Sequence, residues 1–174
     1  MTESIPPSPL AADDALRWTA IILVDHGSRR DASNELLQQA AAAFRAWGPW
    51  TIVEPAHMEL AEPSIAAAFA RCAAQGARRI VVFPYFLSPG RHWSVDIPRL
   101  AREAAAAYPH VEHVVTAPFG LHPLMLQVIG QRIEHCLQHA AGGREACDVC
   151  SDQVGCRLEA PRPADAPPPS PTAS

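Results

Sequence analysis

The sequence contains no lysine, so all 14 of its basic side chains are arginines. Charged residues make up only 18% of the chain, and the formal net charge is −4. Between residues 20 and 141 the arginines are balanced by an equal number of acidic residues, so the sequence does not predict the basic surface that a nucleic-acid-binding protein needs. We therefore expect no nucleic-acid partner.

Long apolar runs are missing as well. No run reaches the roughly 18 apolar residues that a transmembrane helix requires. The first residues lack the basic start and apolar middle of a secretory signal peptide. We therefore expect a soluble, cytoplasmic protein with no membrane partner. In that compartment the five cysteines indicate thiols or metal ligands rather than disulfides.

Apolar residues are scarce at both ends of the chain. Residues 1–18 mix Pro, Ala, Ser and acidic residues without a period, and residues 157–174 are rich in proline. Neither end can bury enough apolar surface to offset the entropy lost on ordering. The sequence therefore predicts a disordered tail over residues 1–18, one α/β domain over residues 19–141, and a C-terminal tail over residues 142–174 that holds cysteines first and prolines after them.

Within residues 19–141, short apolar runs alternate with longer segments whose apolar residues recur at helical spacing. This alternation is typical of βαβ units and predicts a parallel sheet. The expected strands are 19–24, 50–53 with a continuation to Met58 left open, 79–83 continuing towards Phe86, and 111–116. Pro55 indicates a bulge or an early end in the second strand. The expected helices are 31–47, with Asp31 or Ser33 as its cap, then 63–76, 96–108 and 123–141. The residues expected to face the core are Leu36, Leu37, Ala40, Phe44 and Trp47 in the first helix, Ile65, Phe69, Cys72 and Ala73 in the second, and Leu126, Ile129, Ile133 and Leu137 in the last.

Residues that can do chemistry follow three of the predicted strands: His26, Glu59 and His92. The carboxyl ends of parallel strands meet at one edge of a sheet, so we expect these side chains to lie close together. Two imidazoles and one carboxylate with open coordination positions suit a divalent metal such as Fe, Co, Ni or Zn. A structural zinc site would be closed by four ligands, so the pattern favours a catalytic or transfer site.

Each of these residues also has a simpler interpretation. The His26-Gly27-Ser28 turn could bind phosphate through its backbone amides or could be a tight turn. Glu59 could be an acidic residue near a helix N-terminus, although Glu62 has the stronger claim to that role. His57 is as compatible with half-buried packing as with ligation, and it is left out of the predicted site.

Several segments together resemble one family. They are His26-Gly27-Ser28-Arg29, residues 58–64 (Met-Glu-Leu-Ala-Glu-Pro-Ser), residues 83–92 (Phe-Pro-Tyr-Phe-Leu-Ser-Pro-Gly-Arg-His), Asp96-Ile97-Pro98, and residues 117–120 (Ala-Pro-Phe-Gly) shortly before His122. In this order they resemble the small sirohydrochlorin chelatases, the class II tetrapyrrole chelatases of sirohaem and cobalamin synthesis. The resemblance covers residues 20–135.

The resemblance implies an enzyme that inserts Co²⁺ or Fe²⁺ into sirohydrochlorin, or a related tetrapyrrole, without ATP. It implies that His26 and His92 are the catalytic and metal-binding histidines and that Glu59 is an assisting carboxylate. It further implies a homodimer of single chelatase-like domains. Each domain would have a four-stranded parallel sheet in the flavodoxin-like order 2-1-3-4, flanked by helices.

The tetrapyrrole substrate carries carboxylates, which guanidinium groups bind in a bidentate manner. Arginines near the predicted sheet edge could pair with them, or could be solvated loop charges that contribute little. The residues predicted to bind substrate are Ser28, Arg29, Ser88, Gly90 and Arg91, with Arg30 nearby.

The C-terminal tail contains Cys147, Cys150 and Cys156. Some relatives in the resembled family carry a cluster in a C-terminal extension, so these residues could hold an iron–sulfur cluster or zinc. Inert or redox-active thiols are the alternative. Cys72, on the inward face of a helix, is expected to be a core residue.

Two other functions compete with the chelatase. A non-catalytic metal or tetrapyrrole carrier could use the same histidines. A phosphate-recognising α/β enzyme could use the His26 loop, but the sequence has neither a P-loop nor a Gly-x-Gly-x-x-Gly pattern to support it.

Overall fold

A computed structural model describes residues 14–141 of the chain. They fall into two compact units, which divide between Leu121 and His122. A short helix, α1 (Asp14–Arg17), occupies part of the segment predicted as the N-terminal tail. The predicted C-terminal tail, with Cys147, Cys150 and Cys156, lies outside the described residues.

The first unit contains a sheet of four parallel strands, β1 (Thr19–Asp25), β2 (Ile52–His57), β3 (Arg79–Pro84) and β4 (Glu112–Val115). Their order is β2-β1-β3-β4, which confirms the predicted fold. The apolar run of β1 is almost entirely buried, as expected for a strand with neighbours on both sides and helices on both faces.

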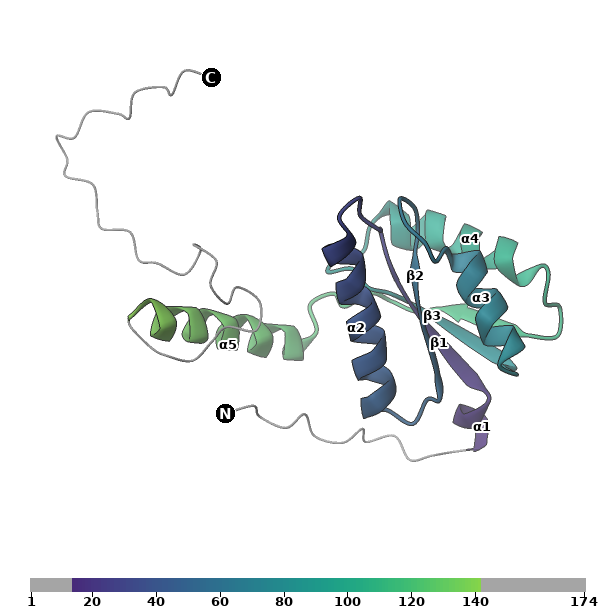
Figure 1. Ribbon diagram of the computed structural model, residues 1–174, viewed down its shortest axis with the longest axis horizontal. Coiled ribbons are helices and arrows are strands. Elements are labelled where there is room, and N and C mark those ends of the chain that lie inside the picture. Colours follow the sequence, from purple (N-terminus) through teal and green to yellow (C-terminus); the bar gives the residue numbers. More distant parts are fainter. Residues whose placement is uncertain (1–13, 142–174) are drawn as a thin grey trace, which may run out of the picture. The chain divides into compact units, whose positions relative to one another are not determined.

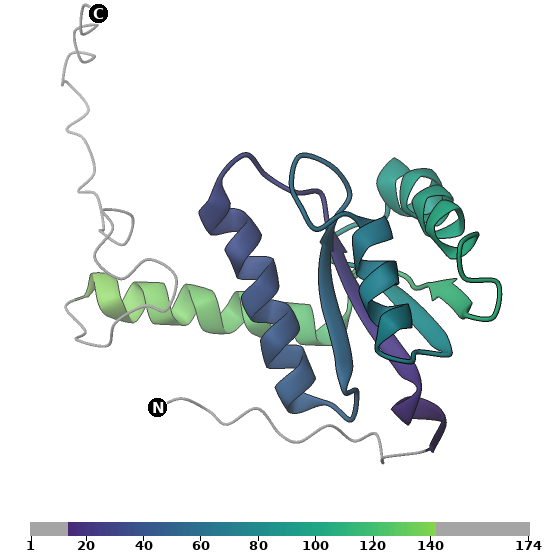
Figure 2. The ribbon, with the colours of Figure 1, turned by 45° about the vertical axis from the view of Figure 1, so that its right-hand side comes forward.

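Helices cover both faces of this sheet (Figures 1 and 2). Helix α2 (Asp31–Trp47) lies on one face, and α3 (Ile65–Ala74) and α4 (Ile97–Ala105) lie on the other. Side chains alternate along β1, so Ile21 and Leu23 join the core beneath α2 while Ile22 and Val24 join the core beneath α3 and α4. The carboxyl ends of β1, β2 and β3 are thereby held at one edge.

Strand β2 follows the longer of its two expected courses, without the bulge or early end that Pro55 indicated. It pairs with β1 in unbroken register from Ile52 to His57, with Pro55 opposite Leu23 and no bulge. Because β2 is an edge strand, a residue without an N–H is tolerated there. The strand therefore extends to His57, which is directly opposite Asp25.

Helix starts differ too. Pro63 precedes α3 rather than occupying its first turn, and the hydroxyl of Ser64 caps the helix by accepting the N–H of Ala67. Arg30, not Asp31 or Ser33, is at the N-cap position of α2, with no side-chain cap. Ile65, Phe69 and Cys72 are buried as predicted, whereas Leu36 is exposed because its neighbour Leu37 takes the inward position.

The segment after β3 is more helical than predicted. Residues expected to lie partly in a loop form one turn of π-helix, η1 (His92–Asp96), which continues directly into α4. The N–H of Ile97 bonds to the carbonyl of His92 and closes the wide turn. The indole N–H of Trp93 donates to the carbonyl of Thr116 at 2.8 Å, which ties η1 to the segment after β4.

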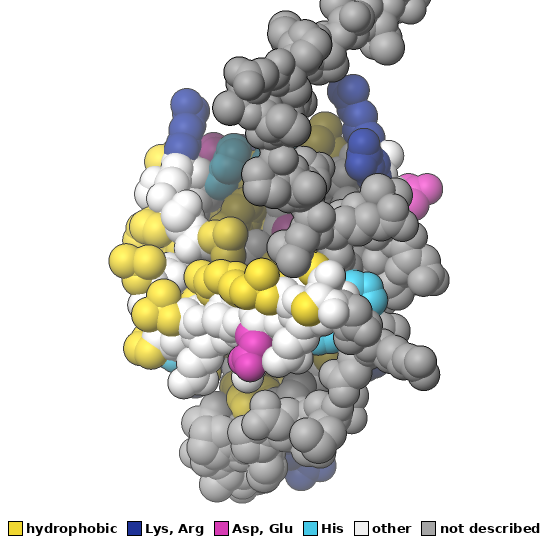
Figure 3. Space-filling view, turned by 90° about the vertical axis from the view of Figure 1, so that its left-hand side faces the viewer, with side chains coloured by type: hydrophobic (Ala, Val, Ile, Leu, Met, Phe, Trp, Pro, Cys, Tyr) yellow, Lys and Arg dark blue, Asp and Glu magenta, His cyan; other side chains and the backbone are white. Residues whose placement is uncertain are grey.

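In the second unit, α5 (Pro123–Ala140) has the predicted helical period. The period places Leu126, Ile129, Ile133 and Leu137 on one apolar face of the helix. Their burial in the core stays a prediction. Figure 3 shows hydrophobic side chains on the face of the molecule that it draws. Among the helices of residues 14–141, none has both the length and the apolarity to cross a membrane.

Candidate functional site

The loops after β1 and β2 are held together by their backbones. Beyond the strands, the N–H of Met58 donates to the carbonyl of Asp25 at 2.8 Å, and the N–H of Glu59 donates to the carbonyl of His26 at 3.1 Å. Parallel pairing therefore continues past the sheet edge. This pairing places His26 and Glu59 side by side.

Gly27 makes this close approach possible. Its φ is +84°, and a Cβ at this position would lie 2.0 Å from the carbonyl oxygen of Glu59. Only glycine fits here, because a side chain would be strained at this positive φ and would also clash with the neighbouring loop. The N–H of Gly27 donates to a carboxylate oxygen of Asp25 at 2.9 Å, which fixes the turn.

The three predicted site residues come together. His26 Nε2 lies 2.7 Å from Glu59 Oε1, and the ring centroids of His26 and His92 are 5.2 Å apart with an interplanar angle of 67°. The side chains of His26, Glu59 and His92 are 40%, 54% and 46% exposed, so a large ligand can reach them.

A second carboxylate, Asp96, orients His92. Its Oδ2 lies 3.0 Å from His92 Nδ1 across the π-helical turn. This contact leaves Nε2 as the nitrogen of His92 that can bind a metal, the arrangement that carboxylate–histidine–metal sites use. The sequence prediction missed Asp96, although its spacing of four from His92 was a usable signal.

Within residues 14–141, no three His, Cys, Asp or Glu side chains are already arranged to hold a metal ion. The contact of His26 Nε2 with Glu59 occupies a nitrogen that a metal would use. Joint ligation by His26, His92 and Glu59 therefore stays a prediction.

The predicted substrate-binding residues lie in the surrounding loops. The Ser28 hydroxyl accepts the N–H of Arg30 at 3.0 Å, and Ser28 exchanges two backbone bonds with the side chain of Asn34 at 2.9 and 2.8 Å. These bonds shape the loop. Arg29, Ser88 and Gly90 are at the surface, and Arg91 lies 4.0 Å from Asp96 with its side chain 82% exposed.

Four further histidines lie outside the predicted site. His57, for which half-buried packing and ligation were both open, is fully buried and contacts Asp25. The ring of His122 caps α5 by accepting the N–H of Leu124. His110 and His113 are exposed.

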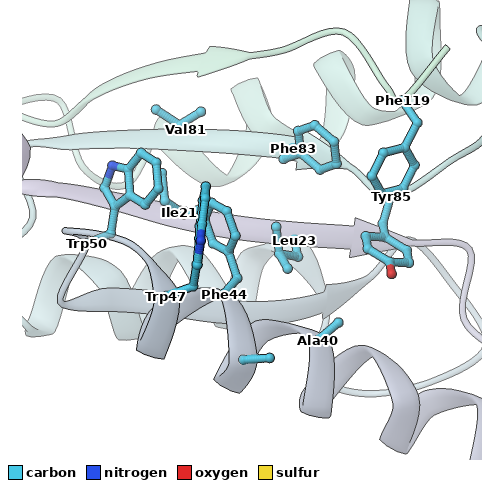
Figure 4. A pocket seen from close by; sticks show the side chains of 11 residues that line it. Ile21, Leu23, Ala40, Phe44, Trp47, Trp50, Val81, Phe83, Tyr85 and Phe119 are labelled. Carbon is cyan, nitrogen blue, oxygen red and sulfur yellow. The ribbon is translucent and has the colours of Figure 1, made fainter. Parts of the chain in front are cut away.

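An apolar pocket of about 490 Å³ lies on the α2 side of the sheet (Figure 4). None of the predicted site residues lines it. Its aromatic wall had been predicted only in part, as core, and consists of Phe44, Trp47, Trp50, Phe83, Tyr85 and Phe119. Apolar surface of this extent on a folded unit is typical of a contact surface.

Comparison with known proteins adds to this geometry. The family model for CbiX matches residues 20–136. The chain is 51% identical over 138 residues to the sirohydrochlorin ferrochelatase, chloroplastic, of Arabidopsis thaliana, covering 79% of this chain and 61% of the relative. It is 30% identical over 115 residues to a sirohydrochlorin cobaltochelatase of Priestia megaterium, covering 66% of this chain and 37% of the relative.

Among solved structures, the chain resembles the sirohydrochlorin chelatase SirB from Bacillus subtilis subspecies spizizenii in complex with cobalt. The TM-score is 0.59 at 32% identity, covering 68% of this chain and 51% of that one. The chain thus spans 61% and 37% of the length of the two curated relatives. Because the match of the family model runs from β1 through most of α5 and includes His26, Glu59 and His92, this chain belongs to the CbiX family.

Proposed function

We propose that this chain inserts a divalent metal, Co²⁺ or Fe²⁺, into sirohydrochlorin or a related tetrapyrrole without ATP. The observation that carries the proposal is the meeting of two imidazoles, 5.2 Å apart, with a carboxylate 2.7 Å from one of them at an open sheet edge. Membership of the CbiX family and the names of the relatives support the same reaction.

The chemistry balances with these residues. As the metal enters the macrocycle, two pyrrole N–H bonds break, two protons leave, and no electron is transferred. A neutral imidazole is a competent proton acceptor near pH 7. Glu59, in contact with His26, offers a second place for a proton before both pass to water.

The openness of the site suits transfer of the metal. His92 presents Nε2, and His26 can present Nε2 once its contact with Glu59 opens. A ligand set this small leaves most coordination positions of the metal for the incoming pyrrole nitrogens. Holding both partners at one edge supplies proximity.

Substrate carboxylates are proposed to bind Arg29 and Arg91, whose exposed guanidinium groups flank the histidines in sequence. Bidentate pairing of guanidinium with carboxylate would orient the macrocycle. Ser28, Ser88 and Gly90 would contribute through the shape and backbone of the same loops.

The proposed activity is tested by measuring how many molecules of sirohydrochlorin each chain metallates. Purified protein, excess sirohydrochlorin and Co²⁺ or Fe²⁺ are mixed without oxygen, and the absorption spectrum of the tetrapyrrole is followed. We expect many equivalents of metallated product per chain. A spectral change that stops at one equivalent would instead identify a carrier. The matched control is His110→Ala, which removes an exposed histidine outside the site.

We also propose that the chain is a homodimer. The apolar pocket beside α2 favours association, because monomers seldom leave such surface in water. Size-exclusion chromatography with light scattering should give twice the chain mass of 18.7 kDa. A mass of one chain at micromolar concentration would refute the dimer.

A cluster or metal site at Cys147, Cys150 and Cys156 stays a prediction, as do the cytoplasmic location and the absence of a nucleic-acid partner. The Arabidopsis relative is described as chloroplastic. For the cysteines, the visible spectrum of protein purified without air is the test. A brown chromophore that is lost in the Cys147→Ser, Cys150→Ser double variant would identify a cluster.

A further inference from the structure

His57 is a fully buried histidine that the proposed chemistry does not use. It is the last residue of β2, and its exposed fraction is 0%. Its Nδ1 lies 2.5 Å from Oδ1 of Asp25, the last residue of β1 and its register partner. The contact joins the two strand ends from which His26 and Glu59 emerge.

The same oxygen of Asp25 holds the turn that carries His26. Oδ1 accepts the N–H of Gly27 at 2.9 Å in addition to its contact with His57. The peptide N–H of Gly27 directly follows His26, so this bond sets the direction in which the His26 side chain leaves the chain. Asp25 thus connects His57 to His26.

His57 also closes the loop that carries Glu59. Its backbone N–H donates to the carbonyl of Pro63 at 2.7 Å, so residues 58–62 form a loop whose two ends meet at His57. The contact with Asp25 fixes this meeting point relative to β1. A displacement of His57 would therefore move Glu59 relative to His26.

Folding alone does not require this arrangement. His57 Nε2 is buried and has no hydrogen-bond partner within residues 14–141. An unsatisfied buried nitrogen is a cost, and an apolar side chain of similar volume often serves a core as well or better than a buried polar pair. The loss of stability from this unsatisfied nitrogen is consistent with a role of His57 in holding the two loops in position.

We propose that Asp25 and the buried His57 form a positioning pair that holds Glu59 against His26 and thereby sets the metal affinity of the His26–His92 site. Neither residue touches substrate. The inference rests on the proposed function, because it concerns the metal that this site would transfer. Residues that orient metal-binding groups typically change metal affinity or activity by about 10- to 100-fold when replaced.

The test separates positioning from packing. His57→Leu removes the donor but fills the space, whereas His57→Asn keeps an N–H donor near the Nδ1 position. Co²⁺ is titrated into each variant without tetrapyrrole and followed by its visible absorption, and kcat and KM for Co²⁺ are measured with sirohydrochlorin. We expect His57→Leu to raise the Co²⁺ dissociation constant and KM by about tenfold or more, and His57→Asn to recover most of that loss.

Phe69→Leu is the control for packing, because Phe69 is fully buried in the core beneath α3 and α4. It should lower the melting temperature without changing Co²⁺ affinity by more than about twofold. If His57→Leu unfolds, Asp25→Asn replaces it, since this variant keeps an acceptor for Gly27 but removes the charge that faces His57.

Two results would overturn the inference. One is a variant, His57→Leu or Asp25→Asn, that binds Co²⁺ as tightly as the wild-type protein. The other is a loss that follows the melting temperature as it does in Phe69→Leu. Failure of the proposed function differs from both, because the wild-type protein would then neither bind Co²⁺ nor metallate sirohydrochlorin, and both proposals would fall.

Discussion

The imidazole rings of His26 and His92 lie 5.2 Å apart, although one follows β1 and the other begins the π-helical turn η1 after β3. Strands β1 and β3 are parallel neighbours in the sheet, so their carboxyl ends reach the same edge. The contact is a direct product of the strand order β2-β1-β3-β4. His26 and His92 are therefore the first residues to replace in a test of the site.

Replacing either histidine should abolish metal insertion. In His26→Ala or His92→Ala we expect the rate to fall by about 10²- to 10⁴-fold, the usual contribution of a positioned proton acceptor. Both side chains are partly exposed, so the circular dichroism spectrum and the melting temperature should remain close to wild type. Near-wild-type turnover in both variants would remove these residues from the mechanism.

Gly27→Ala should disrupt the site and the fold together. The new Cβ would lie 2.0 Å from the Glu59 carbonyl oxygen at a φ of +84°. Backbone strain alone costs about 1–3 kcal/mol, and the clash adds to it. Urea unfolding measures the loss of stability, and the metal-insertion assay measures the loss of activity.

Gly76→Ala is the control for that variant. Gly76 has a similar φ of +87°, but a Cβ there would meet only the Trp18 ring at 3.9 Å. We therefore expect only the backbone strain of about 1–3 kcal/mol, without the clash, and unchanged activity. Equal effects of the two alanine variants would mean that the approach of Gly27 to Glu59 is unimportant.

Asp96→Ala should release His92 from its orientation. The Asp96 carboxylate holds Nδ1 of His92 at 3.0 Å, so its loss allows the ring to turn and either nitrogen to carry the proton. We expect about a tenfold lower kcat for metal insertion. Glu103→Ala, which breaks the exposed Arg99–Glu103 ion pair on α4, should leave kcat unchanged.

Cys72 should be unreactive in the folded protein. Cys72 lies on the buried face of α3. This burial, with a smaller contribution from the charge of Glu54, raises the pKa of its thiol to about 12. Iodoacetamide at pH 8 should therefore modify Cys72 only after unfolding, as measured by mass spectrometry of its peptide. Rapid modification of Cys72 under native conditions would contradict the burial.

The same shift predicts a loss of stability in alkali. The pKa of Cys72 is raised from its ordinary value of 9.0 to about 12, so the folded state disfavours the thiolate. Its contribution to stability is complete below pH 9 and is lost as the pH rises towards 12. Over this range the wild-type protein should lose more stability than Cys72→Ala, as measured by the difference in their melting temperatures.

Much of the architecture could be predicted. The alternation of apolar runs with segments of helical spacing indicated the parallel sheet. Because the carboxyl ends of parallel strands lie at one edge of a sheet, the proximity of His26, Glu59 and His92 could also be predicted from the sequence. The burial of Ile65, Phe69 and Cys72 followed from the 3.6-residue period of α3.

Other features depended on register and could not be predicted from local patterns. The Asp25–His57 contact exists because β2 continues through Pro55 without a bulge, which places the two residues opposite each other. Likewise, the contact between Asp96 and His92 depends on a π-helical turn where a loop was expected.

The order of residues along the chain by itself determined the parallel α/β sheet, the apolar strands at its centre and the kinds of side chain that follow each strand, because these depend on hydrophobic period and on glycine and proline. Only the tertiary structure decided which atoms meet. Distances such as the 2.7 Å between His26 Nε2 and Glu59 Oε1, and the burial of His57, result from strand register and loop closure, which join residues that no local pattern connects.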